Sequence, residues 1–131
     1  MNKKRFIVEL GTGIEIHGQD MTRAAVKAVR DAMGRQCVGL GLGELFNLTG
    51  HDDIILEVLV ACPRPEEVKI DEVKKVLLST QNEVKVVQGG MLARGHIDPV
   101  YKDKAEEIVV ANAAITVLVD TDKVKLEQVC F

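Results

Sequence analysis

The residues best suited to chemistry are a carboxylate and an imidazole, Glu15 and His17, which stand two positions apart in the stretch GTGIEIHGQD. Residues two apart on an extended chain project from the same face, so the two side chains are expected to act together. Such a pair can exchange a proton with a substrate or hold a divalent metal such as zinc. A zinc site needs at least one further ligand, which only His51, His96, Asp20 or a second subunit could supply. The simpler interpretation is a structural hydrogen bond between a strand and the start of a helix.

Glycines surround this pair and indicate room for a ligand. Gly11, Gly13 and Gly18 allow backbone angles and close approaches that other residues do not. Gln19 and Asp20 follow, and Asp20 is a favourable N-cap for the next helix, whose free N–H groups attract an anion. We therefore expect these five residues to line a binding site. A tight turn with an ordinary N-cap is the alternative.

A second group of candidate residues lies later in the chain. Gln88, Gly89 and Gly90 end a predicted strand, and Arg94 follows with a guanidinium that can bind a substrate carboxylate or phosphate. If the first and third strands end close together across a subunit boundary, these residues line the same cleft. Alternatively, the glycines only end a strand and the arginine is solvated.

The elements that must position these residues follow from the periodicity of the apolar side chains. Residues 4–10 alternate as a strand, which is expected to bend at the GTG step and to continue through residues 14–17. Asp20, an apolar stripe at helical spacing and Gly34 predict a helix over residues 21–33. The rest of the pattern predicts a buried strand over 54–62, a helix over 66–78 and strands over 83–88 and 107–119.

Two polar stretches, 37–53 and 91–105, are expected to form loops, and residues 121–131 an edge strand or an exchanged arm. The first stretch contains glycines spaced as GxGxG. They do not follow a strand and open a helix, as a dinucleotide fingerprint requires, so a flexible connection is the better interpretation. Cys62 ends a buried strand before a proline and is expected to be a core thiol.

The order β-α-β-α-β-β predicts an α+β fold in a single domain, residues 1–131, with a four-stranded sheet and both helices on one face. The strands carry apolar residues at both parities, so the uncovered face of the sheet is expected to be apolar too. An exposed apolar face usually meets a partner. The pattern therefore predicts a homo-oligomer.

Composition argues against several classes of partner. The formal net charge is −3 and aromatic residues make up 3% of the chain. These values argue against nucleic acid, because phosphate binding needs a basic patch and base stacking needs aromatic rings. No apolar stretch reaches about 18 residues, so no membrane span is expected. The 3 cysteines lack metal-ligand spacing and are typical of reduced thiols, which predicts a cytoplasmic protein.

The string GTGIEIHG is similar to GxGxDxHG, the signature of a small family of conserved hypothetical proteins, the Lin family. The similarity continues through GQDMTRAAVKAVRDAM, LVACPRPEEV and VQGG, and so extends over essentially the whole chain. The departure is Glu15, where the family has Asp. The family has no established activity, so this resemblance implies membership and no mechanism.

Two more distant resemblances concern enzymes. The opening segment resembles methylerythritol cyclodiphosphate synthase, in which the residues matching Glu15 and His17 bind zinc in a cleft between the subunits of a trimer. The third ligand of that enzyme is a helix histidine, which residues 21–33 lack. The later strands resemble the repeat domain of ring-opening amidohydrolases, but Ala61 and Gln88 replace the Lys and Ser of the hydrolytic pair. These resemblances together imply a chorismate-mutase-like fold that closes as a trimer.

The sequence thus predicts a cytoplasmic homotrimer that binds a small polar or anionic metabolite in inter-subunit clefts around residues 11–20. In this prediction Glu15 and His17 form the candidate catalytic pair of an enzyme. The rival prediction is a non-catalytic oligomeric scaffold or binding module, in which the glycine motif only shapes the assembly. The two differ in whether Glu15 and His17 point into an accessible cleft or into packed protein.

Overall fold

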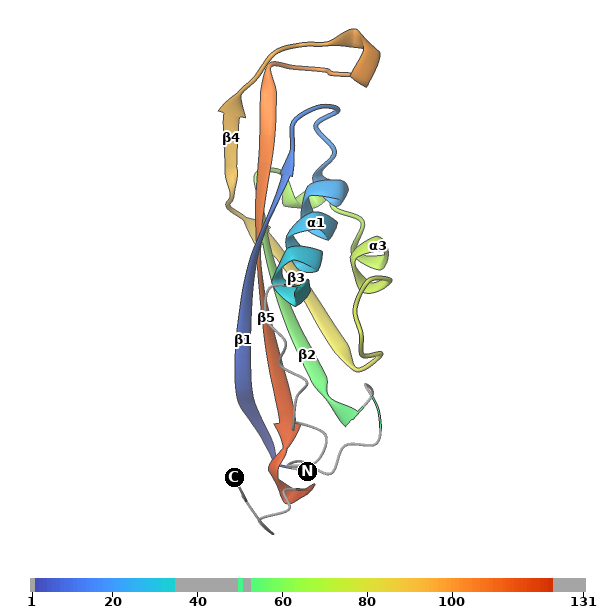
Figure 1. The fold of residues 1–131 in the computed structure, drawn as a ribbon, viewed down its shortest axis with the longest axis vertical. Coiled ribbons are helices and arrows are strands. Elements are labelled where there is room, and N and C mark those ends of the chain that lie inside the picture. The colour runs from blue at the N-terminus through green and yellow to red at the C-terminus, as the bar shows by residue number, and fades with distance from the viewer. Residues whose placement is uncertain (1, 35–49, 51–52, 124–131) are drawn as a thin grey trace.

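The computed structural model describes residues 2–34, 50 and 53–123, and shows a mixed five-stranded sheet with helices on one face (Figure 1). The strands are β1 (Lys3–Glu15), β2 (Ile55–Cys62), β3 (Asn82–Gln88), β4 (Met91–Arg94) and β5 (Glu107–Asp120). Their order is β1-β5-β2-β3, and β4 pairs with β5 beyond the end of β2. Only β2 and β3 pair in parallel among these strands. The α+β class predicted from the sequence is confirmed.

The helix α1 (Met21–Gly34) confirms the prediction for residues 21–33. The Asp20 side chain accepts a hydrogen bond from the backbone N–H of Arg23 at 3.1 Å, which is the expected N-cap. One stripe of α1 packs on the sheet, and its buried residues are Met21, Ala24, Ala25, Ala28, Val29 and Ala32. Among the described residues, no helix is long and apolar enough to cross a membrane.

The small residues of α1 let the helix lie directly on β1. A Cβ atom added to Gly11 would lie 2.3 Å from the carbonyl oxygen of Ala28, and one added to Gly13 would lie 2.1 Å from that of Ala24. Neither position has room for any side chain. The two glycines are therefore required for the contact between strand and helix.

The opposite face of the sheet is apolar and exposed, as the sequence pattern predicted. On β1, Val8, Leu10 and Ile14 point away from α1 and are about half exposed or more. Leu59 of β2 and Met91 of β4 are also exposed, and they share cross-strand rows with Leu10 and Ile14 through β5. We call this surface the open sheet face.

The predicted number of strands, 4, was wrong because β4 lies within the stretch 91–105 that was expected to be a loop. The helix predicted over 66–78 is present but much shorter than predicted. A single 3-10 turn at Pro65–Glu67 is followed by the short helix α3 (Ile70–Lys74). Between them Val68 is extended and buried, and the N–H of Lys69 donates to the Thr22 hydroxyl at 2.9 Å. Burial of Val68 and this bond from α1 thus replace a continuous helix.

The prediction that β1 bends at the GTG step was wrong as well. The strand runs unbroken to Glu15, and its register shift lies between Arg5 and Ile7. The strands predicted over 54–62, 83–88 and 107–119 are confirmed as β2, β3 and β5. The predictions for 37–53 and 121–131 fall largely outside the described residues, of which Thr121–Lys123 form a 3-10 turn.

Candidate functional site

A groove of about 580 Å³ opens where β1 ends and α1 begins, beside the segment that joins β4 to β5. Its lining comes from three places in the chain: the end of β1 and the turn after it, the first two turns of α1, and the segment before β5. The lining residues are Ile14, Glu15, Ile16, His17, Gly18, Asp20, Arg23, Lys27, Tyr101, Lys102 and Lys104. Much of the motif 11–20 therefore faces a space that solvent can enter.

His17 lies in the turn after β1 and is held on two sides. Its ring stacks on the ring of Tyr101, with the centroids 4.3 Å apart and the planes inclined by 13°. Its Nδ1 atom lies 2.8 Å from Oδ2 of Asp103. The side chain remains 33% exposed. The ring is thus fixed in orientation while part of it stays accessible.

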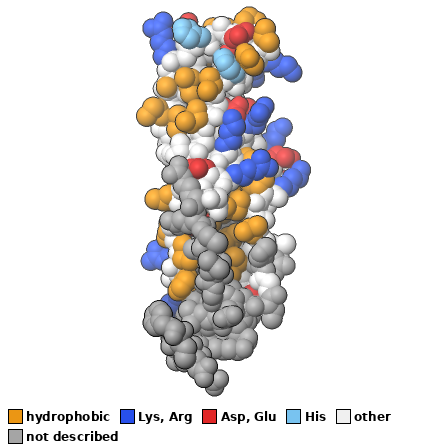
Figure 2. Space-filling model, in the orientation of Figure 1, with side chains coloured by type: hydrophobic (Ala, Val, Ile, Leu, Met, Phe, Trp, Pro, Cys, Tyr) orange, Lys and Arg blue, Asp and Glu red, His pale blue; other side chains and the backbone are white. Residues whose placement is uncertain are grey.

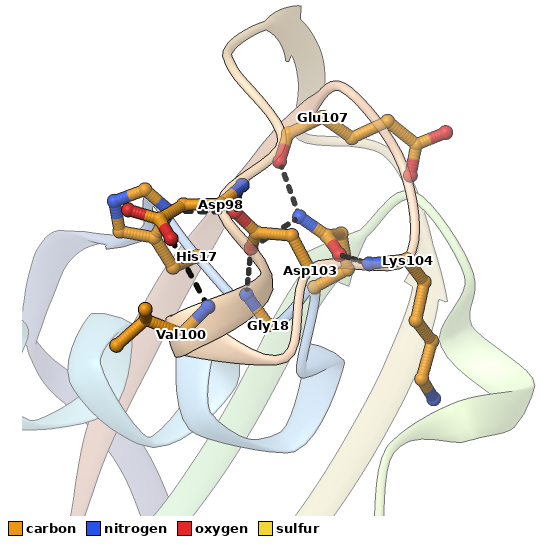
Figure 3. Close-up of polar contacts among 8 residues, drawn as sticks. His17, Gly18, Asp98, Val100, Asp103, Lys104 and Glu107 are labelled. Carbon is orange, nitrogen blue, oxygen red and sulfur yellow. Dashed lines mark hydrogen bonds and ion pairs between the residues drawn. The ribbon is translucent and has the colours of Figure 1, made fainter.

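Asp103 is the centre of the polar network (Figure 3). Its side chain has no exposed surface, and it accepts hydrogen bonds from the backbone N–H of Gly18 at 2.6 Å and of Asp98 at 2.8 Å. The Gln19 amide adds a longer bond at 3.3 Å. Burial alone would raise the pKa of Asp103, but these donors and His17 outweigh it and hold the pKa well below its usual range. The side chain is therefore a carboxylate at any ordinary pH.

Gln19 connects the turn after β1 to the start of β5 by two hydrogen bonds. It is 5% exposed, its amide nitrogen donates to the carbonyl of Glu107 at 2.9 Å, and its amide oxygen accepts from the N–H of Lys104 at 2.8 Å. Gln19 has φ 47° and Lys102 has φ 59°, which are left-handed values that side chains other than glycine seldom adopt. Strained backbone of this kind tends to gather at functional sites.

Glu15 is buried against α1 and does not pair with His17. Its Oε1 atom contacts the Lys27 ammonium and lies 3.7 Å from Nε of Arg23. The Lys27 ammonium also donates to the carbonyl of Ile14 at 2.9 Å. β1 ends at Glu15, so the turn sends His17 toward Tyr101 while Glu15 stays beneath the helix. Glu15 therefore positions two cations at the wall of the groove.

The described residues of a single chain do not form a zinc site. Within residues 2–34, 50 and 53–123, no three His, Cys, Asp or Glu side chains gather as a ligand set. One nitrogen of His17 and one oxygen of Glu15 are already engaged by Asp103 and Lys27. Asp20 caps α1, and His96 is exposed on the segment after β4. His51 lies outside the described residues.

Several predicted ligand residues do not line the groove within one chain. They are Gly11, Gly13, Gln19, Gln88, Gly89, Gly90 and Arg94. The N–H of Gly89 donates to the carbonyl of Cys62 at 3.1 Å, and a Cβ on Gly90 would lie 2.1 Å from the carbonyl oxygen of Val110. Arg94 is exposed and pairs with Glu106 at 3.2 Å. Gln88, Gly89 and Gly90 lie away from the groove because β5 and β2 separate β3 from β1 in the sheet.

Sequence reasoning missed the residues that the β4–β5 segment contributes. Asp103 carries no local pattern that marks it, and Tyr101, Lys102 and Lys104 sit in a stretch expected to be an ordinary loop. One signal was available on α1. Arg23 and Lys27 are four residues apart, so they lie on the same face of the helix that follows the motif. This spacing places both cations close to the end of residues 11–20.

The match to a family model extends over both walls of this groove. The Lin0512 model of conserved hypothetical proteins matches residues 5–117. The chain belongs to the Lin0512 family. This confirms the resemblance drawn from GTGIEIHG. The Lin0512 match includes the motif 11–20 together with Asp103, so both partners of the central contact lie within the family's common region.

A solved structure shares the fold of this Lin0512 protein. It is the crystal structure of an FtsZ-like protein of unknown function from Nostoc punctiforme, with a TM-score of 0.82 and 40% sequence identity. The match covers 92% of this chain and 99% of that chain. No curated protein matches the chain. The comparisons therefore define the family and the fold, and leave the activity to be argued from the groove.

Proposed function

We propose that this protein binds a small anionic metabolite, one carrying a carboxylate or a phosphate, in the groove between α1 and the β4–β5 segment. The observation that carries the proposal is a surplus of cations in the groove lining. Two carboxylates, Glu15 and Asp20, face a larger set of basic side chains, which are Arg23, Lys27, Lys102 and Lys104. This local positive charge contrasts with the net charge of −3 of the whole chain.

Both carboxylates of the lining already interact with other groups of the protein. Glu15 holds Lys27 and Arg23, and Asp20 caps the helix. In the part of the chain that the structure describes, no carboxylate forms an ion pair with Lys102 or Lys104. Figure 2 shows Lys and Arg side chains gathered over the side of the molecule that carries α1. An incoming anion would meet these cations without displacing an internal partner of Lys102 or Lys104.

Apolar surface beside the cations suits the carbon skeleton of such a ligand. Ile16 is 57% exposed, and it lines the groove together with Tyr101. Small-molecule sites commonly combine an apolar wall with a few polar groups that fix orientation. The groove has both components, which favours a metabolite over a bare inorganic ion.

We also propose that the protein assembles as a homotrimer through the open sheet face. The support is the apolar surface of the open sheet face, because a contiguous exposed apolar face usually marks an interaction site. Ile14 belongs both to this face and to the groove lining. A second copy on the face would therefore border the groove, in keeping with the expectation of an inter-subunit cleft.

The test of anion binding is titration of the protein with inorganic phosphate and, separately, with malonate, followed by amide chemical shifts. We expect saturable shifts in residues 14–27 and 101–104, with affinity weakened about tenfold in Lys104→Ala, since a hydrogen bond to a charged group contributes roughly 1.5–3 kcal/mol. The matched control is Lys85→Ala, an exposed lysine on β3 at the far edge of the sheet. Equal binding by both variants, or no saturation with either anion, would favour the scaffold interpretation, in which the His17–Asp103 contact only anchors the β4–β5 segment.

A further inference from the structure

We propose that His17 is the proton-transfer group of the groove and that Asp103 is its positioning residue. The inferred reaction moves a proton within a small anionic substrate that carries an acidic C–H beside a carbonyl group. The inference rests on the proposed anion site, because the cations of that site would hold the substrate against His17.

The first step of the argument concerns the protonation of the imidazole. An ionised carboxylate only accepts hydrogen bonds. Asp103 is ionised, so the 2.8 Å contact requires that Nδ1 of His17 carries the hydrogen. In neutral imidazole the other nitrogen then has a free lone pair. Among the described residues, Nε2 of His17 has no hydrogen-bond partner.

The second step concerns geometry. The stack on Tyr101 and the bond to Asp103 leave the ring no freedom to turn, yet a third of the side chain is exposed and lines the groove. A base must hold its lone pair toward the proton that it removes. Here the bare nitrogen is the part of the ring that the protein leaves without a partner.

The third step concerns charge. When Nε2 takes a proton, the imidazolium lies directly against the Asp103 carboxylate, which stabilises it by a charge-assisted hydrogen bond. The same relation between carboxylate and imidazole supports the base in hydrolytic triads. The N–H donors of Gly18 and Asp98 keep Asp103 fixed and ionised throughout.

The fourth step concerns the reaction class. None of the groove-lining residues is Ser, Thr or Cys, so the lining offers His17 no aliphatic hydroxyl or thiol to activate as a nucleophile. In the inferred reaction the proton comes from the substrate. The C–H bond breaks, an N–H bond forms on Nε2, and the electron pair stays on the substrate as an enolate. Lys27 and Lys104 stand at the groove to stabilise that charge, and the proton then returns from Nε2 to carbon or oxygen, so no oxidant or reductant is needed.

The experiment measures exchange of the C3 protons of 2-oxobutanoate for solvent deuterium by NMR, with wild type, His17→Gln and Asp103→Asn. We expect exchange to fall about 100-fold in His17→Gln, which is the usual contribution of a general base. We expect a fall of about tenfold in Asp103→Asn. His96→Gln is the matched control, because His96 is exposed and does not line the groove. Equal exchange by wild type and His17→Gln would overturn the assignment.

A second measurement separates this inference from the binding proposal and from a purely structural contact. Diethyl pyrocarbonate modifies unprotonated imidazole nitrogens, and mass spectrometry resolves His17 from His96. We expect His17 to react severalfold faster than His96, to slow in Asp103→Asn, and to be protected by inorganic phosphate. Protection without fast reaction would overturn the role of His17 and preserve anion binding. Fast reaction without protection would overturn the anion site instead. The amide spectra of His17→Gln and Asp103→Asn show whether each variant keeps the native fold.

Discussion

The Nδ1 atom of His17 lies 2.8 Å from Oδ2 of Asp103, although 86 residues separate the two in the chain. This contact joins the turn after β1 to the segment before β5. Gly18 and Gln19 donate to the other oxygen of the same carboxylate, so one buried side chain organises both walls of the groove. Asp103 therefore matters to stability as well as to the candidate chemistry.

Replacing Asp103 should destabilise the protein in a pH-dependent way. The pKa of Asp103 is depressed in the folded state, so its stabilising contribution is fully present above the unfolded value of about 3.9. That contribution is lost as the pH falls through the lower folded value. Urea unfolding of wild type and Asp103→Asn should thus differ equally at pH 7 and pH 5, and the difference should shrink below about pH 4. Asp71→Asn, in the first turn of α3, is the exposed control. A difference that widened on acidification would contradict this explanation.

Gly13→Ala should destabilise the protein strongly. The new Cβ would lie 2.1 Å from the carbonyl oxygen of Ala24, so α1 must move off the strand. Overpacking of this kind costs roughly 1–3 kcal/mol or more. Gly34→Ala is the matched control, because no described residue lies within 4 Å of its added methyl at the end of α1. We expect the control to be neutral or stabilising in urea unfolding, since alanine favours a helix over glycine. Equal midpoints for both variants would refute the close-contact argument.

Glu9→Gln should stabilise the protein at neutral pH. Glu9 is 4% exposed, and its Oε1 atom is buried with no hydrogen-bond partner among the described residues. Burial raises the pKa of Glu9, so stability is present below the unfolded value of about 4.3 and is lost as the pH rises through the folded value. Removing the charge should add roughly 1 kcal/mol at pH 7 and little at pH 4. Glu66→Gln, an exposed residue of the 3-10 turn, should show no such pH dependence. Thermal unfolding at both pH values measures the effect, and a destabilised Glu9→Gln at pH 7 would contradict it.

Leu10→Lys should dissociate the proposed trimer without unfolding the subunit. Leu10 lies on the open sheet face and is 66% exposed in the single chain, so a lysine there is solvated unless another subunit covers it. Sedimentation velocity should show a trimer for wild type and a monomer for the variant. Leu78→Lys is the matched control, because Leu78 is 57% exposed and follows α3 in the chain, outside the strands that form the open sheet face. A monomeric wild type would remove the trimer and the inter-subunit cleft together.

The local sequence pattern was sufficient to predict an element where residues close in the chain determine its structure. α1 follows from its N-cap, its apolar stripe and its terminal glycine, and the near-continuous apolar run of β2 identified a central strand. Cys62 at the end of that strand is buried, with its Sγ atom 3.2 Å from the sulfur of Met21, as expected for a core thiol. The long helix predicted over residues 66–78 does not form because of a tertiary contact. The Thr22 hydroxyl of α1 accepts the hydrogen bond of the Lys69 N–H, which a continuous helix would have used.

The sequence by itself determined the family, the α+β class, an uncovered apolar sheet face and the position of the motif 11–20 between a strand and the helix α1. Each of these depends on spacing along the chain, which a reader of the sequence can see. Only the tertiary structure decided what the members of that motif do. It packs Gly11 and Gly13 against α1. It pairs Glu15 with Lys27, and it places Asp103 within hydrogen-bond distance of His17. The physical reason is that the long strand β5 returns antiparallel beside β1, so residues at opposite ends of the sequence meet at one end of the sheet.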